Sequence, residues 1–165
     1  FTRRLSAGIG TYVTNNIYDE YGKYMNGTSY SVYPRLSYSI DGTKYLILRG
    51  GVSRDDTAND IYKNWRYTVG LGFGSELPWG FFVYLEPSLS WTRYDGARWT
   101  VKNNKFTEIT ERDFGQRYTV SLSNNKLDFW GFVPTLTFGY TRRDSNIENR
   151  GYNKMSVEFT MRQKF

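Results

Sequence analysis

The residues from Trp130 to Thr141, WGFVPTLTFGYT, alternate between two kinds of side chain. Large apolar residues and one proline occupy the even positions, whereas glycine, threonine and one valine occupy the odd positions. Successive side chains of a β-strand point to opposite faces, so this period of two predicts a strand with one apolar and one polar face. Pro134 cannot donate a ladder hydrogen bond, and it therefore predicts a local bulge or bend in the strand. The alternative is that the proline weakens the pairing of two strands, so that the barrel wall can open there for a substrate.

The same alternation recurs along the whole chain. Two further strands carry a proline in the same setting, Pro34 in YPRLSY and Pro87 in EPSLSW, and all three prolines fall on the apolar parity. The pattern gives about eight strands of about ten residues, the length that crosses a bilayer at a tilt. We therefore predict an all-β fold, an antiparallel transmembrane β-barrel spanning residues 1–165. These strands form either a single small barrel or the C-terminal part of a larger one.

The predicted connections alternate in length, as they do in outer-membrane barrels with short periplasmic turns. Short turns are predicted at residues 41–42, 77–80 and 124–126, and long polar loops at 15–27, 54–64, 94–113 and 142–153. A soluble β-sandwich also shows alternating strands, but it exposes a charged face. Here the polar face holds mostly serine, threonine and glycine, which favours the barrel.

The composition excludes several functions. Aromatic residues make up 19% of the chain, mean hydropathy is −0.63, and no apolar run is long enough for a membrane-spanning helix. The chain lacks histidine and cysteine, and we predict a protein without enzymatic activity, metal or cofactor. The net charge of +6 comes from scattered basic residues, which argues against nucleic-acid binding. Because Phe1 follows neither an initiator methionine nor a signal peptide, we expect a mature chain or a fragment.

Seven charged residues share the polar parity and are predicted to face the lumen: Arg35, Arg49, Arg66, Glu86, Arg117, Glu158 and Arg162. Charges enclosed in a barrel are expected to pair, so a network of ion pairs is a better interpretation than a carboxylate dyad of Glu86 and Glu158. Glycines on the same parity, such as Gly8, Gly70 and Gly72, either make room for large side chains in a closed barrel or line a wide lumen.

The last strand carries apolar residues at alternating positions, Val157, Phe159 and Met161, and the chain ends in Phe165. A terminal aromatic residue after such alternation is typical of the signal by which barrel assembly machinery selects outer-membrane strands. Gln163 departs from the pattern.

Three segments resemble one family: RDFGQRYTVSLSNNKL, WGFVPTLTFGYTRRDSNI and YNKMSVEFTMRQKF. They are similar to the C-terminal barrel region of the surface lipoprotein assembly modifiers of Gram-negative bacteria. The residues that carry the resemblance most clearly are Gly131, Phe132, Pro134, Arg143, Asp144, Ser145, Asn146 and Ile147. The resemblance covers roughly the last third of the chain and is weaker upstream.

The resemblance implies a barrel of about fourteen strands behind a periplasmic helical-repeat domain. It also implies an integral outer-membrane protein that assists translocation or surface display of a lipoprotein or a related secreted protein. Its expected partners are outer-membrane lipids, the barrel assembly machinery and that substrate. Two alternatives stay open, namely a small structural or adhesion barrel that acts through its long loops, and a passive pore.

Overall fold

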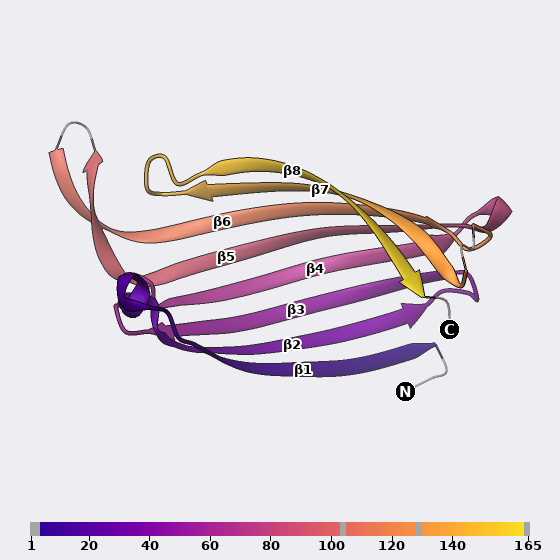
Figure 1. Ribbon diagram of the computed structural model, residues 1–165, viewed down its shortest axis with the longest axis horizontal. Helices are drawn as coiled ribbons and strands as arrows, with labels where there is room; N and C mark the ends of the chain where they lie inside the picture. Colours follow the sequence, from indigo (N-terminus) through magenta and orange to yellow (C-terminus); the bar gives the residue numbers. More distant parts are fainter. Residues whose placement is uncertain (1–3, 103–104, 128–129, 164–165) are drawn as a thin grey trace.

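The chain folds into one antiparallel sheet in which every strand pairs with its neighbours in sequence (Figure 1). The computed structural model describes residues 4–102, 105–127 and 130–163. The strands are β1 (Leu5–Asn16), β2 (Gly27–Ser39), β3 (Lys44–Thr57), β4 (Asn64–Glu76), β5 (Phe81–Lys102), β6 (Lys105–Asn124), β7 (Phe132–Ser145) and β8 (Tyr152–Gln163). The predicted all-β antiparallel fold with eight strands is confirmed.

Two short 3₁₀ helices interrupt the strands, η1 (Glu20–Met25) and η2 (Pro78–Gly80). In the described part of the chain, no helix has both the length and the apolar character needed to cross a membrane. The connection before β7 is longer than the predicted turn at 124–126, since β6 ends at Asn124 and β7 begins at Phe132. Gly131 has a φ of 82° in this connection, a left-handed conformation that favours glycine.

Short and long connections lie at opposite ends of the sheet. The turn between β2 and β3 is closed by Asp41, whose carboxylate accepts hydrogen bonds from the backbone N–H groups of Thr43 and Lys44. This end also holds η2, the start of β1 and the end of β8, whereas η1 lies at the opposite end, with the longer connections (Figure 1). We call these the turn end and the loop end.

The predicted loop at 94–113 is wrong. β5 continues to Lys102 and β6 starts at Lys105, so these residues form a long hairpin that bends away from the sheet at the loop end (Figure 1). A register shift between Arg93 and Ala97 accompanies the bend. Bulged strands bend because extra residues on one strand must be accommodated opposite fewer on the other.

The three prolines lie within strands without any register shift. Pro34 and Pro87 each keep a continuous ladder on one side, while on the other side the ladder is interrupted locally and resumes in the same register. Pro134 pairs with Met161 of β8, and the ladder to β6 ends one residue away. The predicted bulge at Pro134 is therefore absent, because a missing N–H affects only the neighbour toward which it would point.

The two faces of the sheet differ as the alternation predicts. The outer face, defined by residues such as Leu48, Leu71, Val120 and Phe138, is apolar and exposed across β2 to β8. The inner face carries the polar parity and the charged residues. Buried apolar residues are few among those described, namely Ile47, Val133 and Ile147. A sheet with this distribution has no apolar core of its own and leaves its largest apolar surface uncovered.

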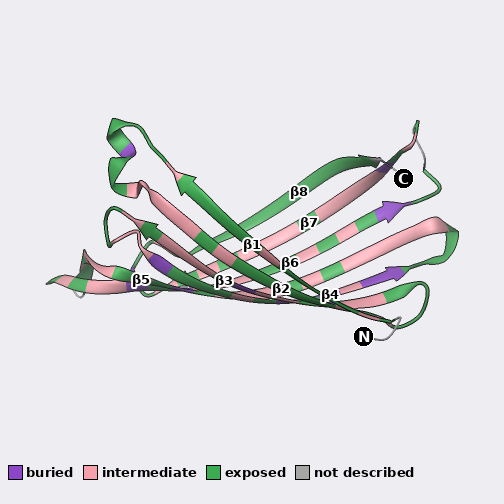
Figure 2. Cartoon of the chain, turned by 90° about the horizontal axis from the view of Figure 1, so that it is seen from below, coloured by how far each residue is buried: buried purple, intermediate pink, exposed green. Residues whose placement is uncertain are grey.

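The sheet does not close on itself within the described residues. Its strand order runs from β1 to β8, and no ladder joins these two strands, which form the two margins of a strongly curved and twisted sheet (Figure 2). In β8, every residue from Tyr152 to Arg162 is exposed, on both faces. The closed eight-stranded barrel considered from the sequence is therefore not what these residues form.

Candidate functional site

The inner face of the sheet is built around glycines that make room for tyrosine rings. A Cβ atom at Gly72 would collide with the ring and hydroxyl of Tyr84, and one at Gly74 would collide with the ring of Tyr45. The two rings stack with centroids 6.4 Å apart, above strands β3 to β5. Small residues on this parity therefore serve close approach of large neighbours here, which is one of the two roles expected from the sequence.

Tyr84 brings one charge cluster together in the middle of the inner face. Its hydroxyl donates a hydrogen bond to the carboxylate of Glu86, and Arg49 contacts both groups across β3, β4 and β5. The Arg49 guanidinium lies 5.9 Å from the centroid of the Tyr84 ring. This Arg49 cluster is half-buried, with 39% of the arginine side chain and 21% of the glutamate side chain exposed.

The other five predicted lumen charges do not join this cluster. These five residues form no ion pair with any residue that the structure describes: Arg35, Arg66, Arg117, Glu158 and Arg162. Two of them make hydrogen bonds, since Arg35 donates to Ser37 and Arg66 donates to Thr92. The predicted network is thus reduced to a single pair. An open, curved sheet keeps these groups apart and accessible to water, so their charges do not have to be neutralised.

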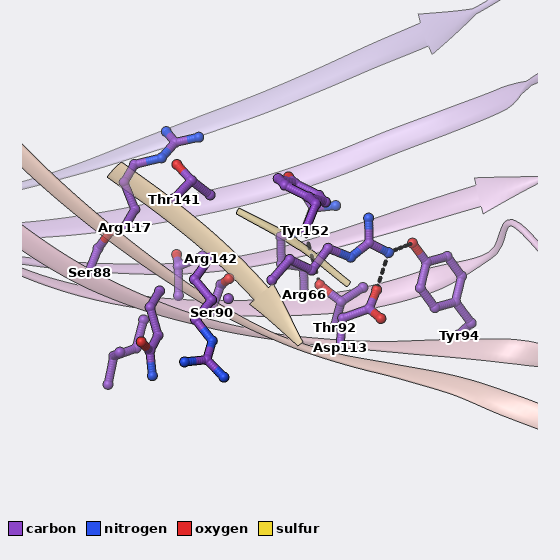
Figure 3. A pocket seen from close by; sticks show the side chains of 15 residues that line it. Arg66, Ser88, Ser90, Thr92, Tyr94, Asp113, Arg117, Thr141, Arg142 and Tyr152 are labelled. Atoms are coloured by element: carbon purple, nitrogen blue, oxygen red, sulfur yellow. Dashed lines mark hydrogen bonds and ion pairs between the residues drawn. The ribbon is translucent and has the colours of Figure 1, made fainter. Parts of the chain in front are cut away.

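Hollows along the inner face separate these charges. One, of about 510 Å³, lies beside Gly8, Gly10 and Gly70 and reaches Glu86. A second, of about 290 Å³, lies between β4 and β8 (Figure 3). Arg117 and Thr141 stand at one end of it, and Tyr94 and Asp113 at the other, where Arg143 contacts both. The inner face therefore offers hydroxyl and guanidinium groups along a surface that side chains do not fill.

A second charge cluster at the loop end was not predicted. Glu111 of β6 has none of its side chain exposed and receives three arginines, Arg98 from β5, Arg143 from β7 and Arg150 from the β7–β8 loop, each at 3.1 Å. Asp113 also contacts Arg143. Arg98 further donates to the carbonyl of Ile61 in the β3–β4 loop, at 2.8 Å. This Glu111 cluster ties the long hairpin to two neighbouring loops.

The prediction of a loop at 94–113 is the reason this cluster was missed. Once the hairpin is extended, Arg98 and Thr100 alternate with Trp99 and Val101, and this alternation was the available signal. The glycine, aspartate and charge content of the segment indicated a turn more strongly, as single-sequence patterns often do at bulges.

Five of the eight residues that carry the family resemblance, 143–147, form the end of β7 and the start of the neighbouring loop. The side-chain oxygen of Asn146 accepts a hydrogen bond from the Arg112 backbone at 2.7 Å, and its amide donates to the Thr110 carbonyl at 2.9 Å. Ser145 accepts from the backbone of Ile147, which is buried, and Asp144 pairs with Arg142. This motif, 143–147, therefore anchors the end of β7 to β6 and to the Glu111 cluster.

The eight-stranded, two-faced sheet with alternating short and long connections defines the wall of a β-barrel. Comparison with solved structures supports this class. The β-domain of the Bordetella autotransporter Brka matches with a TM-score of 0.52 and 17% identity, covering 95% of this chain and 69% of that one. At this level of identity the likeness shows the fold alone.

The chain belongs to the surface lipoprotein assembly modifier family, which matches residues 2–165. A protein of Pasteurella multocida (strain Pm70) called surface lipoprotein assembly modifier is 24% identical over 144 residues, 85% of this chain. A hemophilin secretion modulator of Acinetobacter baumannii is 27% identical over 101 residues, 59% of this chain. The matched parts cover 28% and 18% of these two relatives, so this chain corresponds to a minor part of each.

Proposed function

We propose that this chain forms part of the wall of an outer-membrane β-barrel that assists translocation or surface display of a lipoprotein or a related secreted protein. The observation that carries the proposal is the two-faced sheet with unpaired margins in a chain of this family. The apolar outer face is the surface that hydrocarbon would cover. The names of the two relatives support the substrate class.

The unpaired margins favour a larger barrel. In a bilayer each unsatisfied backbone group costs several kcal/mol, so strands at an open edge require partners. β1 and β8 present such edges, and β8 is exposed on both faces. Further strands of the full-length protein would close the wall and enclose the inner face as a lumen.

The inner face suits a polar conduit without catalytic activity. Its hollows border hydroxyl groups and arginines that are free of ion pairs within the described residues, such as Arg66 and Arg117. An extended polypeptide can exchange hydrogen bonds with such groups without a fixed binding geometry. The chain has no histidine, the commonest general base, which supports transport rather than catalysis as the proposed activity.

The outward side chains of β8 are proposed to serve barrel assembly. Val157, Phe159 and Met161 lie on one exposed face of this margin strand, where a partner strand or an assembly factor has access. Phe165, the final residue of the predicted signal, lies outside the described residues.

The proposal is tested by filling the lumen in the full-length protein. Gly8 faces the hollow of about 510 Å³, and a Cβ atom added to it would meet no other atom within 4 Å, so a side chain can start from this position and Gly8→Trp would project into the hollow. We expect a several-fold loss of surface lipoprotein, measured by protease accessibility on intact cells. Ala7→Trp, on the adjacent outward position, is exposed and does not line this hollow, so it is the matched control and should retain display. Unchanged display after deletion of the gene would overturn the function itself.

A further inference from the structure

The outer face at the loop end carries two arginines that directly oppose each other. Arg93 of β5 pairs in register with Arg112 of β6, and both side chains are exposed. Like charges in such a cross-strand position destabilise a sheet unless a counter-charge lies between them. Within the described residues neither guanidinium forms an ion pair. Asp95 interacts electrostatically with Arg93 but is ion-paired with Arg54, so the arginine pair is a site of excess positive charge.

Two other arginines of the outer face are compensated, Arg54 in the same ladder row and Arg142 two outward positions nearer the turn end. Arg54 contacts Asp95 at 2.6 Å and Asp56 at 3.9 Å. Arg142 contacts Asp144 at 3.1 Å. The difference marks the Arg93–Arg112 pair as the place where an external anion would be most favourable.

An aromatic row lies directly beneath this pair. Tyr67, Trp91 and Phe114 are opposite one another in successive ladders, and the rings of Trp91 and Phe114 have centroids 5.7 Å apart. The next outward-facing row toward the loop end lies two residues further along each strand. In that row Trp65 opposes Arg93. Aromatic rings favour the boundary between hydrocarbon and headgroups, so the arginines would lie at headgroup depth.

A groove of about 440 Å³ joins Tyr67 of the aromatic row to Arg93, which opposes Arg112 in the ladder. Its lining includes Trp65, Tyr67, Arg93, Asp95 and Thr110. Trp65 and Tyr67 stack with centroids 6.4 Å apart and form an apolar wall. The acidic member, Asp95, is already engaged by Arg54, so it does not compete for Arg93 as a free carboxylate.

We propose that this groove, lined by Arg93 and with Arg112 opposite Arg93 on the neighbouring strand, binds the phosphate-bearing headgroup of a membrane lipid in the leaflet at the loop end. The inference rests on the proposed position in the outer membrane. Guanidinium groups bind phosphate oxygens in bidentate geometry, and basic residues at a membrane surface attract anionic lipids. The aromatic wall selects a lipid over a free anion because it offers contact to sugar or acyl groups that a free anion lacks.

The test measures binding to the full-length protein in a neutral detergent, with lipid A as the probe. Two arms identify the source of the phosphate: lipid A from which phosphate has been removed, and inorganic pyrophosphate. We expect lipid A to bind saturably and Arg93→Gln/Arg112→Gln to weaken it about thirtyfold, since each basic residue contributes about a factor of five. The two other probes should bind at least about tenfold more weakly than lipid A to the unaltered protein.

Arg142→Gln is the matched control, because this arginine lies on the same face but is paired with Asp144. The affinity of the Arg142→Gln protein for lipid A should stay within about threefold of that of the unaltered protein. Resistance of each variant to unfolding on unheated gels reports correct folding, and Arg93→Gln alone replaces the double variant if that protein fails to fold.

Three results would overturn the site: equal affinity of the folded double variant, equal binding of dephosphorylated lipid A, or binding of pyrophosphate as tight as that of lipid A. The binding assay does not require secretion, so its failure is distinct from failure of the proposed function. Normal lipoprotein display after gene deletion would contradict the function while leaving the binding curve unchanged.

Discussion

The two charge clusters of the inner face differ in how deeply they are buried and in how many segments of the chain they connect. The Glu111 cluster places one fully buried carboxylate among three arginines from three different segments. The Arg49 cluster joins one half-buried ion pair and a tyrosine hydroxyl within the central strands. Each buried charge needs nearby partners, whereas a hydrated charge does not.

This difference separates two roles for charge in the same sheet. The Glu111 cluster holds the bent hairpin against the loops that 58–63 and 146–151 form, and it therefore shapes the loop end. The Arg49 cluster leaves hollows on both sides and keeps the centre of the inner face polar. We expect substitutions in the first to affect stability and those in the second to affect it much less.

The largest effect is expected from Glu111→Gln in the full-length protein. Removing this charge leaves three arginines around a neutral group in a buried site, which costs about 3–5 kcal/mol of unfolding free energy. Urea unfolding of the reconstituted protein measures the change. Glu108→Gln lies on the exposed outward side of the same hairpin and should change the free energy by less than about 0.5 kcal/mol. Similar values for the two variants would remove the distinction between the clusters.

A smaller loss is expected when the support of the Arg49 cluster is altered. Gly72→Val places side-chain atoms where the Tyr84 ring lies, so it displaces the ring and costs about 1–3 kcal/mol. Gly8→Val is the control on the same face, because nothing lies within 4 Å of its added Cβ. Unfolding measured under one set of conditions compares the two. Equal stability of both variants would show that Tyr84 does not depend on the glycine.

The Arg49–Glu86 ion pair itself should contribute about 1–2 kcal/mol, because it is partly hydrated. A double-mutant cycle of Arg49→Gln and Glu86→Gln measures this coupling. Arg117 and Glu158 both line a different hollow of the inner face and form no ion pair with each other. They provide the control cycle, which should give a coupling near zero. Coupling of equal size in both cycles would indicate a general field effect of the inner face.

The smallest effect concerns a second partly exposed ion pair, Arg54 and Asp95, which lies at the loop end and not at the centre of the sheet. The Arg54 guanidinium donates to Asp95 and holds the pKa of that carboxyl below its usual range. A lowered pKa contributes stability above the unfolded value of about 3.9, and this contribution is lost as pH falls through the folded value. Asp95→Asn should therefore cost less than about 1 kcal/mol at neutral pH and nothing in strong acid. Unfolding across a pH series checks this, and a difference that persists in acid would contradict it.

Much of the fold was predictable because strand alternation is a local property. The parity of Leu48 against Arg49, or of Phe138 against Thr137, follows from neighbouring residues alone and assigns each face correctly. Errors arose where the local signal was interrupted. The bulge was expected at Pro134 but occurs at Arg93–Ala97, where extra residues rather than a missing N–H shift the register.

The candidate site was predictable only in part for the same reason. The alternation placed Arg49 and Glu86 on one face but also placed five other charges there, and it did not show which of them meet. The contact depends on the register of β3, β4 and β5 and on the room that Gly72 gives to Tyr84. Register is set by pairing between distant segments, so it is not visible in a single strand.

The sequence by itself determined the class of protein, since a period of two with an apolar and a polar parity specifies two-faced strands wherever they pair. Only the tertiary structure decided that no ladder joins β1 to β8 among the described residues, that β5 and β6 continue into a long hairpin, and that Glu111 contacts Arg98, Arg143 and Arg150. These outcomes depend on curvature and on contacts between segments far apart in the chain. Such long-range geometry is a property of the assembled sheet and not of any local pattern.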